Sequence, residues 1–92
     1  MADFEWDPAK AERNLRVHGV SFDEAMAVFD DDQRLEEFDL LHSGLEDRQI
    51  VIGFSATIRL LMVVTTERYE TIRIVSARKA NAREIERYFA AR

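Results

Sequence analysis

Three short apolar runs in the second half of the chain constrain its fold more than any other feature. The runs are rich in Ile, Val, Leu and Phe, and each is too short to form a helix of its own. They occupy residues 50–54, 60–64 and 72–75. The links at residues 55–57 and 69–70 are short enough for hairpin turns, so the pattern predicts a three-stranded antiparallel meander. The middle run, LLMVV, has no polar position, which predicts a central strand covered on both faces.

The first part of the chain predicts one edge strand and two helices. Residues 3–6 alternate acidic and aromatic side chains, as a short edge strand does. Asp7 is a typical N-cap for a helix that begins with proline, and Gly19 is a typical helix stop. Residues 21–24 have the pattern of a capping box, which predicts a second helix ending near residue 29.

The remaining segments are a turn, an ambiguous stretch and a last helix. The three aspartates at residues 30–32 predict a solvated turn and no metal site, because adjacent acids at a helix end point in different directions. Residues 34–41 are compatible with a strand or a loop. Asn81 is the N-cap of a helix over residues 81–92.

Together these elements predict an α+β fold in one domain, residues 1–92. Its small antiparallel sheet consists of the meander and the short N-terminal edge strand. Two N-terminal helices and one C-terminal helix pack on one face of this sheet.

Composition limits the classes of protein to which the chain can belong. Its 92 residues include no cysteine, which excludes disulfides and cysteine zinc sites. No apolar run approaches the roughly 18 residues of a membrane span, and the acidic N-terminus has no signal-peptide core. We therefore expect a cytoplasmic protein without membrane contact. The net charge of −5 is unevenly divided, with −9 in residues 1–53 and +4 in residues 54–92, so the second half is the better candidate for binding phosphate.

Polar side chains gather at the ends of the predicted strands. If the first hairpin centres on residue 56, residue 48 faces 64 and residue 46 faces 66; if the second centres on residues 69–70, residue 66 faces 73. A slip of one residue would scatter the polar side chains that share a face. This register places four of them on one face at one end of the sheet, namely Glu46, Arg48, Thr66 and Arg73, with Arg68 close by. Arg78 falls toward the opposite end.

Several ordered motifs resemble the BrnT family of bacterial type II toxins over nearly the whole length. They are W-D-x-x-K-x-x-x-N-x-x-x-H-G-V-S-F, then E-D-R, G-x-S, T-E-R and R-I-V-S-A-R. No single motif is specific, but the ordered set is. The chain departs from the family at Ile58, where the family often has glycine before the arginine.

The resemblance implies both a function and a partner. It implies a RelE-like ribonuclease fold and a ribosome-independent endoribonuclease that blocks translation by cutting RNA. It further implies a hetero-oligomer with a BrnA-type antitoxin. The ribbon-helix-helix domain of that antitoxin binds DNA, so the toxin would meet DNA only through it.

RNA cleavage that uses the 2′-hydroxyl needs a base, cations that stabilise the phosphorane and an acid for the leaving oxygen, with no cofactor or metal. Glu46 is the candidate base, Arg48 and Arg68 the candidate phosphate clamp, and Thr66 a donor to a phosphate oxygen. The candidates for further RNA contact are Arg73, Arg78 and Lys10. Imidazole ordinarily titrates near neutrality, and the chain has two, His18 and His42. His18 is better explained as a helix-end residue.

Two alternatives use the same residues differently. Glu46 with Arg48 or Arg73 would also make an ordinary cross-strand ion pair, which contributes little at a surface. A small α+β domain with an acidic half and a basic rim would also suit a non-catalytic binding module, or a degenerate toxin that keeps only its antitoxin interface. Activity of the isolated protein on RNA separates these readings.

Overall fold

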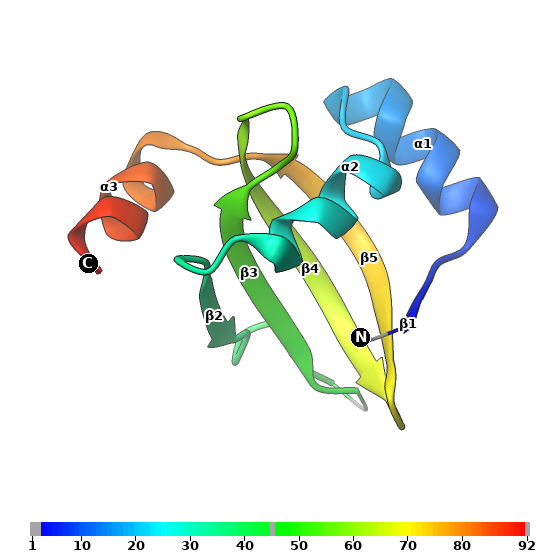
Figure 1. The fold of residues 1–92 in the computed structure, drawn as a ribbon. Coiled ribbons are helices and arrows are strands. Elements are labelled where there is room, and N and C mark those ends of the chain that lie inside the picture. The colour runs from blue at the N-terminus through cyan, green and yellow to red at the C-terminus, as the bar shows by residue number, and fades with distance from the viewer. Residues whose placement is uncertain (1–2, 45, 92) are drawn as a thin grey trace.

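In the described part of the chain, five strands form one mixed sheet in the order β1-β5-β4-β3-β2 (Figure 1). The computed structural model describes residues 3–44 and 46–91. Its centre is the predicted antiparallel meander, in which each strand extends beyond its apolar run. The three strands are β3 (Arg48–Phe54), β4 (Leu60–Arg68) and β5 (Thr71–Lys79).

Two short strands complete the sheet at its edges. The predicted N-terminal edge strand is β1 (Asp3–Glu5), and the ambiguous residues 34–41 contain β2 (Leu35–Phe38), which pairs antiparallel with β3. β1 runs parallel to β5, so the prediction of a wholly antiparallel sheet is wrong in this one pair. No hairpin joins these two strands, and alternation of side chains carries no information about strand direction.

The helices begin at the predicted N-caps, and the first helix ends at the predicted glycine; the last helix ends at Ala90, and residue 92, where we expected its end, lies outside the described residues. The Asp7 carboxylate accepts a bond from the Ala9 amide, and Gly19 adopts the left-handed conformation at the helix end (φ 70°). The Asn81 side chain and the Glu84 carboxylate make both bonds of a capping box. The helices are α1 (Pro8–His18), α2 (Phe22–Met26), which continues into the 3-10 helix η1 (Ala27–Asp30), and α3 (Ala82–Ala90). None of the helices in the described part of the chain is long and apolar enough to cross a membrane.

The helices cover both faces of the sheet, which corrects the prediction of a single covered face. Figure 1 shows α1 and α2 on one side of the meander and α3 apart from them, beyond β3. α1, α2 and η1 enclose one core with the central strands, in which Val63 of β4 is fully buried. On the opposite face, Tyr88 of α3 packs against Ile52 and Met62. The middle strand is apolar on both sides, so it needs cover on both.

The cover on the α3 face is partial. Tyr88 is 1% exposed, but its neighbours on the apolar stripe of α3, Ile85 and Phe89, remain 40% and 49% exposed. α3 packs mainly against β3. The end of this sheet face that lies toward the β4–β5 turn carries polar side chains.

A β-bulge divides β5 into two parts. Val64 faces Ser76 and the next residue of β4 faces Ile74, so Val75 has no opposite residue. The extra residue shifts the alternation of side chains along the strand. Arg73 and Arg78, which lie five residues apart, consequently point to the same face of the sheet.

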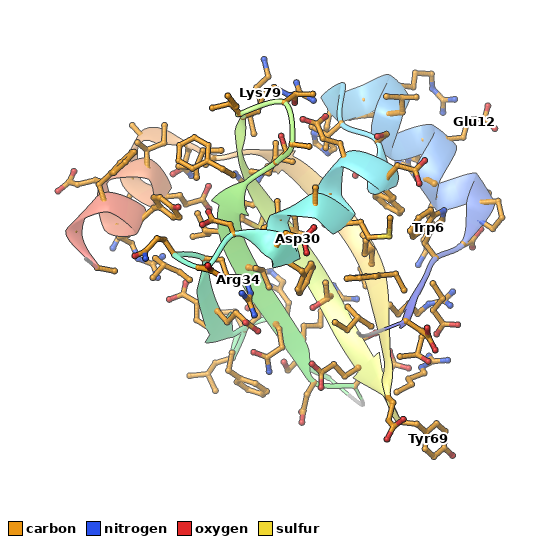
Figure 2. All side chains as sticks on the ribbon, viewed as in Figure 1. Trp6, Glu12, Asp30, Arg34, Tyr69 and Lys79 are labelled. Carbon is orange, nitrogen blue, oxygen red and sulfur yellow. The ribbon has the colours of Figure 1, made fainter. Side chains whose placement is uncertain are left out.

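Both hairpin turns of the meander contain a side chain in left-handed backbone conformation. Ile58 in the β3–β4 turn has φ 58° and Tyr69 in the β4–β5 turn has φ 57°. Figure 2 shows Tyr69 at the tip of its turn, pointing away from the molecule. A β-branched residue is strained in this conformation, whereas glycine adopts it freely.

Candidate active site on the partly covered sheet face

A row of four residues crosses the partly covered face, one from each of four strands. Glu5 of β1 faces Arg73 of β5, Arg73 faces Thr66 of β4, and Thr66 faces Arg48 of β3. Residues that lie opposite each other in neighbouring strands share a face. The prediction that Arg48, Thr66 and Arg73 come together is therefore confirmed by the register.

The register of the first hairpin differs from the predicted one by two residues. Arg48 faces Thr66 where we expected residue 64, because the turn centres one residue later than residue 56. The predicted pairing of residues 66 and 73 is confirmed. A two-residue slip preserves the face of every side chain, whereas a one-residue slip would reverse it. The cluster survives for this reason.

Glu46 and Arg68 form an ion pair beside this row. The Arg68 guanidinium donates to the Glu46 carboxylate, so the partner of Glu46 is neither Arg48 nor Arg73. The two side chains are 48% and 52% exposed. An ion pair with this exposure contributes about 0–1 kcal/mol, and a ligand that competes for the guanidinium would separate it at little cost.

The other two arginines of the cluster differ in their partners. Arg73 lies 3.6 Å from the Glu5 carboxylate. Within residues 3–44 and 46–91, the Arg48 guanidinium has neither a hydrogen-bond partner nor an ion-pair partner. Arg48 is therefore the cation of the cluster that is most available to an added anion.

Thr66 lies buried between these arginines in the row. Its side chain is 2% exposed, and its hydroxyl has no hydrogen-bond partner among the described residues. A buried hydroxyl without a partner is costly, so Thr66 is the residue of this row whose polar group the contacts of the described residues leave unsatisfied. The hydroxyl reaches a ligand only after neighbouring side chains shift.

A tight turn at the start of β3 adds a histidine to this end of the sheet. The His42 imidazole Nδ1 lies 3.0 Å from the Asp39 carboxylate. The Ser43 hydroxyl donates to the Asp39 carbonyl and accepts from the Arg48 amide, at 2.6 and 2.9 Å. The Asp39 amide donates to the Arg48 carbonyl at 2.8 Å. Sequence reasoning missed Asp39, although its spacing of three residues from His42 is the usual one for a side-chain contact across a turn.

Arg78 lies at the opposite end of the sheet, as predicted. It donates two bonds to the Glu84 carboxylate, at 2.8 and 2.9 Å, and so attaches α3 to β5. Burial raises the pKa of Glu84, but bonds from Arg78 and from the Asn81 backbone outweigh this and hold the pKa below its ordinary value. The structure therefore gives Arg78 a structural contact and does not bring it into the cluster.

Lys10 also lies away from the cluster. It belongs to α1, where it lines an open hollow of about 350 Å³ together with Arg13 and His18. The helix packs against β5 through the buried Asn14, whose amide donates to the carbonyls of Val20 and Ala77 at 2.9 and 2.8 Å. The K-x-x-x-N-x-x-x-H motif thus consists of a structural asparagine with two basic residues on the same side of the helix.

A partly buried carboxylate, that of Glu24, explains the polar residues after G-x-S. Glu24 accepts bonds from Ser55, Thr57 and Arg59, which join α2 to the β3–β4 turn. The bond from Arg59 is the main reason that the pKa of Glu24 falls to about 2. The capping box predicted for residues 21–24 is thus half formed. The Ser21 hydroxyl accepts from the Glu24 amide, but the Glu24 carboxylate bonds to side chains of the β3–β4 turn and not to the Ser21 amide. This network is structural.

Asp31 also differs from its prediction as part of a solvated turn. Its carboxylate accepts bonds from the Phe54 amide at 2.9 Å and from the Tyr88 hydroxyl at 2.6 Å. These bonds connect the end of η1 to β3 and to α3. Across the described residues, no group of three His, Cys, Asp or Glu side chains is arranged to hold a metal ion.

The fold and the site define a small α+β protein that presents a row of arginines on a partly covered sheet face, the kind of surface that attracts phosphate. Residues 6–84 match the model of a family described as ribonuclease toxin, BrnT, of type II toxin-antitoxin system. Because this match covers most of the chain, the protein belongs to the BrnT family of ribonuclease toxins.

A solved structure agrees with this assignment at the level of the fold. The chain is similar to the Brucella abortus ribonuclease toxin BrnT, whose crystal structure was determined at 1.1 Å, with a TM-score of 0.66 and 18% sequence identity. The similarity covers 88% of this chain and 99% of the Brucella chain. At this identity the likeness establishes the α+β fold alone. No curated protein matches the sequence.

Proposed function

We propose that this protein is a ribosome-independent endoribonuclease that cuts RNA and thereby inhibits translation and growth. The single observation that carries the proposal is the row of Arg73, Thr66 and Arg48 on the partly covered face, in a chain of a ribonuclease toxin family. The resemblance to the BrnT family implies a RelE-like fold and a cytoplasmic location, and we include both in the proposal.

The proposed chemistry is transesterification by the substrate's own 2′-hydroxyl, without a metal. Arg48 and Arg68 bind the phosphate and stabilise the charge of the phosphorane. Thr66 donates to a phosphate oxygen, and Arg73 contacts the neighbouring RNA backbone. Glu46 removes the proton of the 2′-hydroxyl.

The Glu46–Arg68 ion pair fits this division of roles. A phosphate that binds the Arg68 guanidinium competes directly with the Glu46 carboxylate. Because the pair is half exposed, its separation costs little, and Glu46 is then released next to the bound phosphate. We infer that the ion pair is the resting arrangement and that substrate binding opens it.

The proposed partner is a BrnA-type antitoxin with a ribbon-helix-helix domain, which would bind this protein in a hetero-oligomer and connect it to DNA. An adjacent reading frame with a ribbon-helix-helix pattern would support this partner. Arg68→Ala should abolish growth inhibition while leaving co-purification with the antitoxin intact, because the exposed guanidinium contributes to phosphate binding and little to the fold. Growth arrest by Arg68→Ala at equal expression would contradict the phosphate-clamp role.

The decisive experiment is cleavage of an end-labelled single-stranded RNA by the purified, antitoxin-free protein in EDTA. Arg48→Gln should lower the rate by about 100-fold or more, as the loss of one charge-stabilising donor does. Glu46→Ala should also lose cleavage. Arg83→Gln is the matched control, because it makes the same charge change on an exposed residue of α3.

Each outcome has a defined meaning. Products with a 2′,3′-cyclic phosphate and a 5′-hydroxyl, formed in EDTA, support transesterification without a metal. Equal losses in Arg48→Gln and Arg83→Gln would show a general effect of charge and would refute the site. No cleavage by a folded wild-type protein would favour a binding module or a degenerate toxin that keeps only the antitoxin interface.

A further inference from the structure

The proposed reaction leaves one role without a residue, the acid that protonates the leaving 5′-oxygen. The turn between β2 and β3 contains an imidazole held by a buried carboxylate. The Asp39 side chain is 9% exposed and the His42 side chain is 68% exposed. The imidazole therefore rests on a largely buried acceptor and presents its other edge to solvent.

The contacts determine which edge is presented. His42 Nδ1 donates to the Asp39 carboxylate, with 3.0 Å to Oδ2 and 3.2 Å to Oδ1, and the His42 amide also donates to Oδ1 at 3.3 Å. Since Nδ1 is occupied, the exposed Nε2 is the nitrogen that can exchange a proton with a ligand. A carboxylate that accepts from Nδ1 also holds the ring in a fixed orientation, which is the arrangement that positions a catalytic histidine.

The turn is attached directly to the proposed site. Asp39 and Ser43 bond the backbone of Arg48 from both sides, through the Arg48 carbonyl and the Arg48 amide. The hydrogen bonds within residues 39–48 thus fix the imidazole relative to the first residue of β3. Arg48 is the cation to which we assign the phosphate.

We infer that His42 is the general acid of this nuclease and that Asp39 is its positioning residue, a conclusion that rests on the proposed function. The 2′-oxygen attacks phosphorus, and its proton passes to Glu46. The bond between phosphorus and the 5′-oxygen breaks, and the proton on His42 Nε2 moves to that oxygen. The products are a 2′,3′-cyclic phosphate, a 5′-hydroxyl, a neutral imidazole and a protonated Glu46, which exchange their protons with solvent before the next turnover.

A substrate with an altered leaving group tests the acid role directly. We would first map a cut made by the wild-type protein, then prepare the same RNA with sulfur in place of the 5′-oxygen at that bond. A thiol has a much lower pKa than an alcohol. A thiolate therefore leaves without being protonated, whereas an alkoxide needs an acid. Loss of a general acid therefore slows cleavage of the oxygen substrate and not of the sulfur substrate.

His42→Gln should lower the rate on the oxygen substrate by about 100-fold or more and leave the rate on the sulfur substrate within about threefold of wild type. Leu41→Gln is the matched control, because it introduces glutamine at the preceding residue, whose side chain is 89% exposed. It should match wild type on both substrates. Asp39→Asn should show the same pattern as His42→Gln with a smaller loss, because the imidazole loses its charged acceptor but remains in place. Thermal unfolding of each variant controls for the fold.

The opposing results are equally clear. An equal loss on both substrates in a folded His42→Gln protein would assign His42 to binding or structure and overturn the acid role. An unchanged rate on the oxygen substrate would overturn it as well. Cleavage of neither substrate by wild type would overturn the proposed function itself, and the acid role with it.

Discussion

Replacing Thr66 by valine should make the protein more stable and less active. Thr66 is 2% exposed and its hydroxyl has no partner among the described residues. A buried polar group left unsatisfied costs about 1–3 kcal/mol, and valine fills nearly the same volume with the same branching at Cβ. We therefore expect Thr66→Val to raise the free energy of unfolding by about 1–2 kcal/mol. For a domain of this size, that corresponds to a rise in Tm of about 5–10 °C.

Urea and thermal unfolding of three proteins would test this estimate: wild type, Thr66→Val and Thr66→Ser. Serine keeps the hydroxyl and removes one buried methyl group, so Thr66→Ser should lower the free energy of unfolding by about 1 kcal/mol. The expected order of stability is valine, then threonine, then serine. RNA cleavage should follow a different order, with activity retained by serine and lost by valine, because the hydroxyl is the proposed donor to phosphate.

A loss of stability in Thr66→Val would refute the reasoning. It would mean that the hydroxyl has a partner in solution, such as an ordered water molecule, whose bond valine cannot replace. Full cleavage activity in a stabilised Thr66→Val protein would refute the phosphate contact and leave the stability argument intact.

Three further substitutions test the structural contacts. Glu24→Gln should lower the free energy of unfolding by about 2–3 kcal/mol at pH 7. The difference should shrink as pH falls from about 4.5 toward 2, because a carboxyl with a lowered folded pKa adds its full stability above the unfolded pKa and loses it as the folded carboxyl is protonated. A difference that persists at pH 2 in urea titrations would contradict this. Ile58→Gly should raise the free energy of unfolding by up to about 1 kcal/mol, because it relieves left-handed strain at a side chain that is 80% exposed, and a lower Tm would argue against strain. Asn14→Ala should lower the free energy of unfolding by about 3 kcal/mol or more, because it leaves the buried carbonyls of Val20 and Ala77 without their donor. A decrease below about 1 kcal/mol in urea unfolding would show that water replaces the amide.

The strand-end cluster could be predicted because the apolar runs determine which face each residue takes. The predicted pairing of Arg48 with residue 64 was wrong by two positions, and an even error leaves Arg48, Thr66 and Arg73 on one face. The helix caps were predictable for a similar reason, because Asp7, Gly19 and Asn81 act on backbone within a few residues.

Long-range choices were not predictable from local patterns. Nothing in the spacing of Tyr88 and its neighbours states which face of the sheet α3 covers, and the parallel direction of β1 has no local signal. The role of Asp31 was missed because its partners, Phe54 and Tyr88, lie 23 and 57 residues away along the chain. Asp39 was missed because its burial and its bonds to His42 and Arg48 are what mark it out, and the sequence shows neither.

The bulge at Val75 has a consequence for changes in chain length. The bulge shifts the alternation of side chains by one residue between the part of β5 that carries Arg73 and the part that carries Arg78. Because of this shift, both arginines lie on the same face although five residues separate them. Deleting the extra residue would shorten the spacing of the arginines by one position and restore strict alternation, and both arginines would still lie on the same face. The spacing and the bulge are therefore coupled, because an odd spacing keeps both arginines on one face only with the bulge and an even spacing does so only without it. In a relative of this protein, an odd spacing between two such arginines would indicate that the bulge is kept.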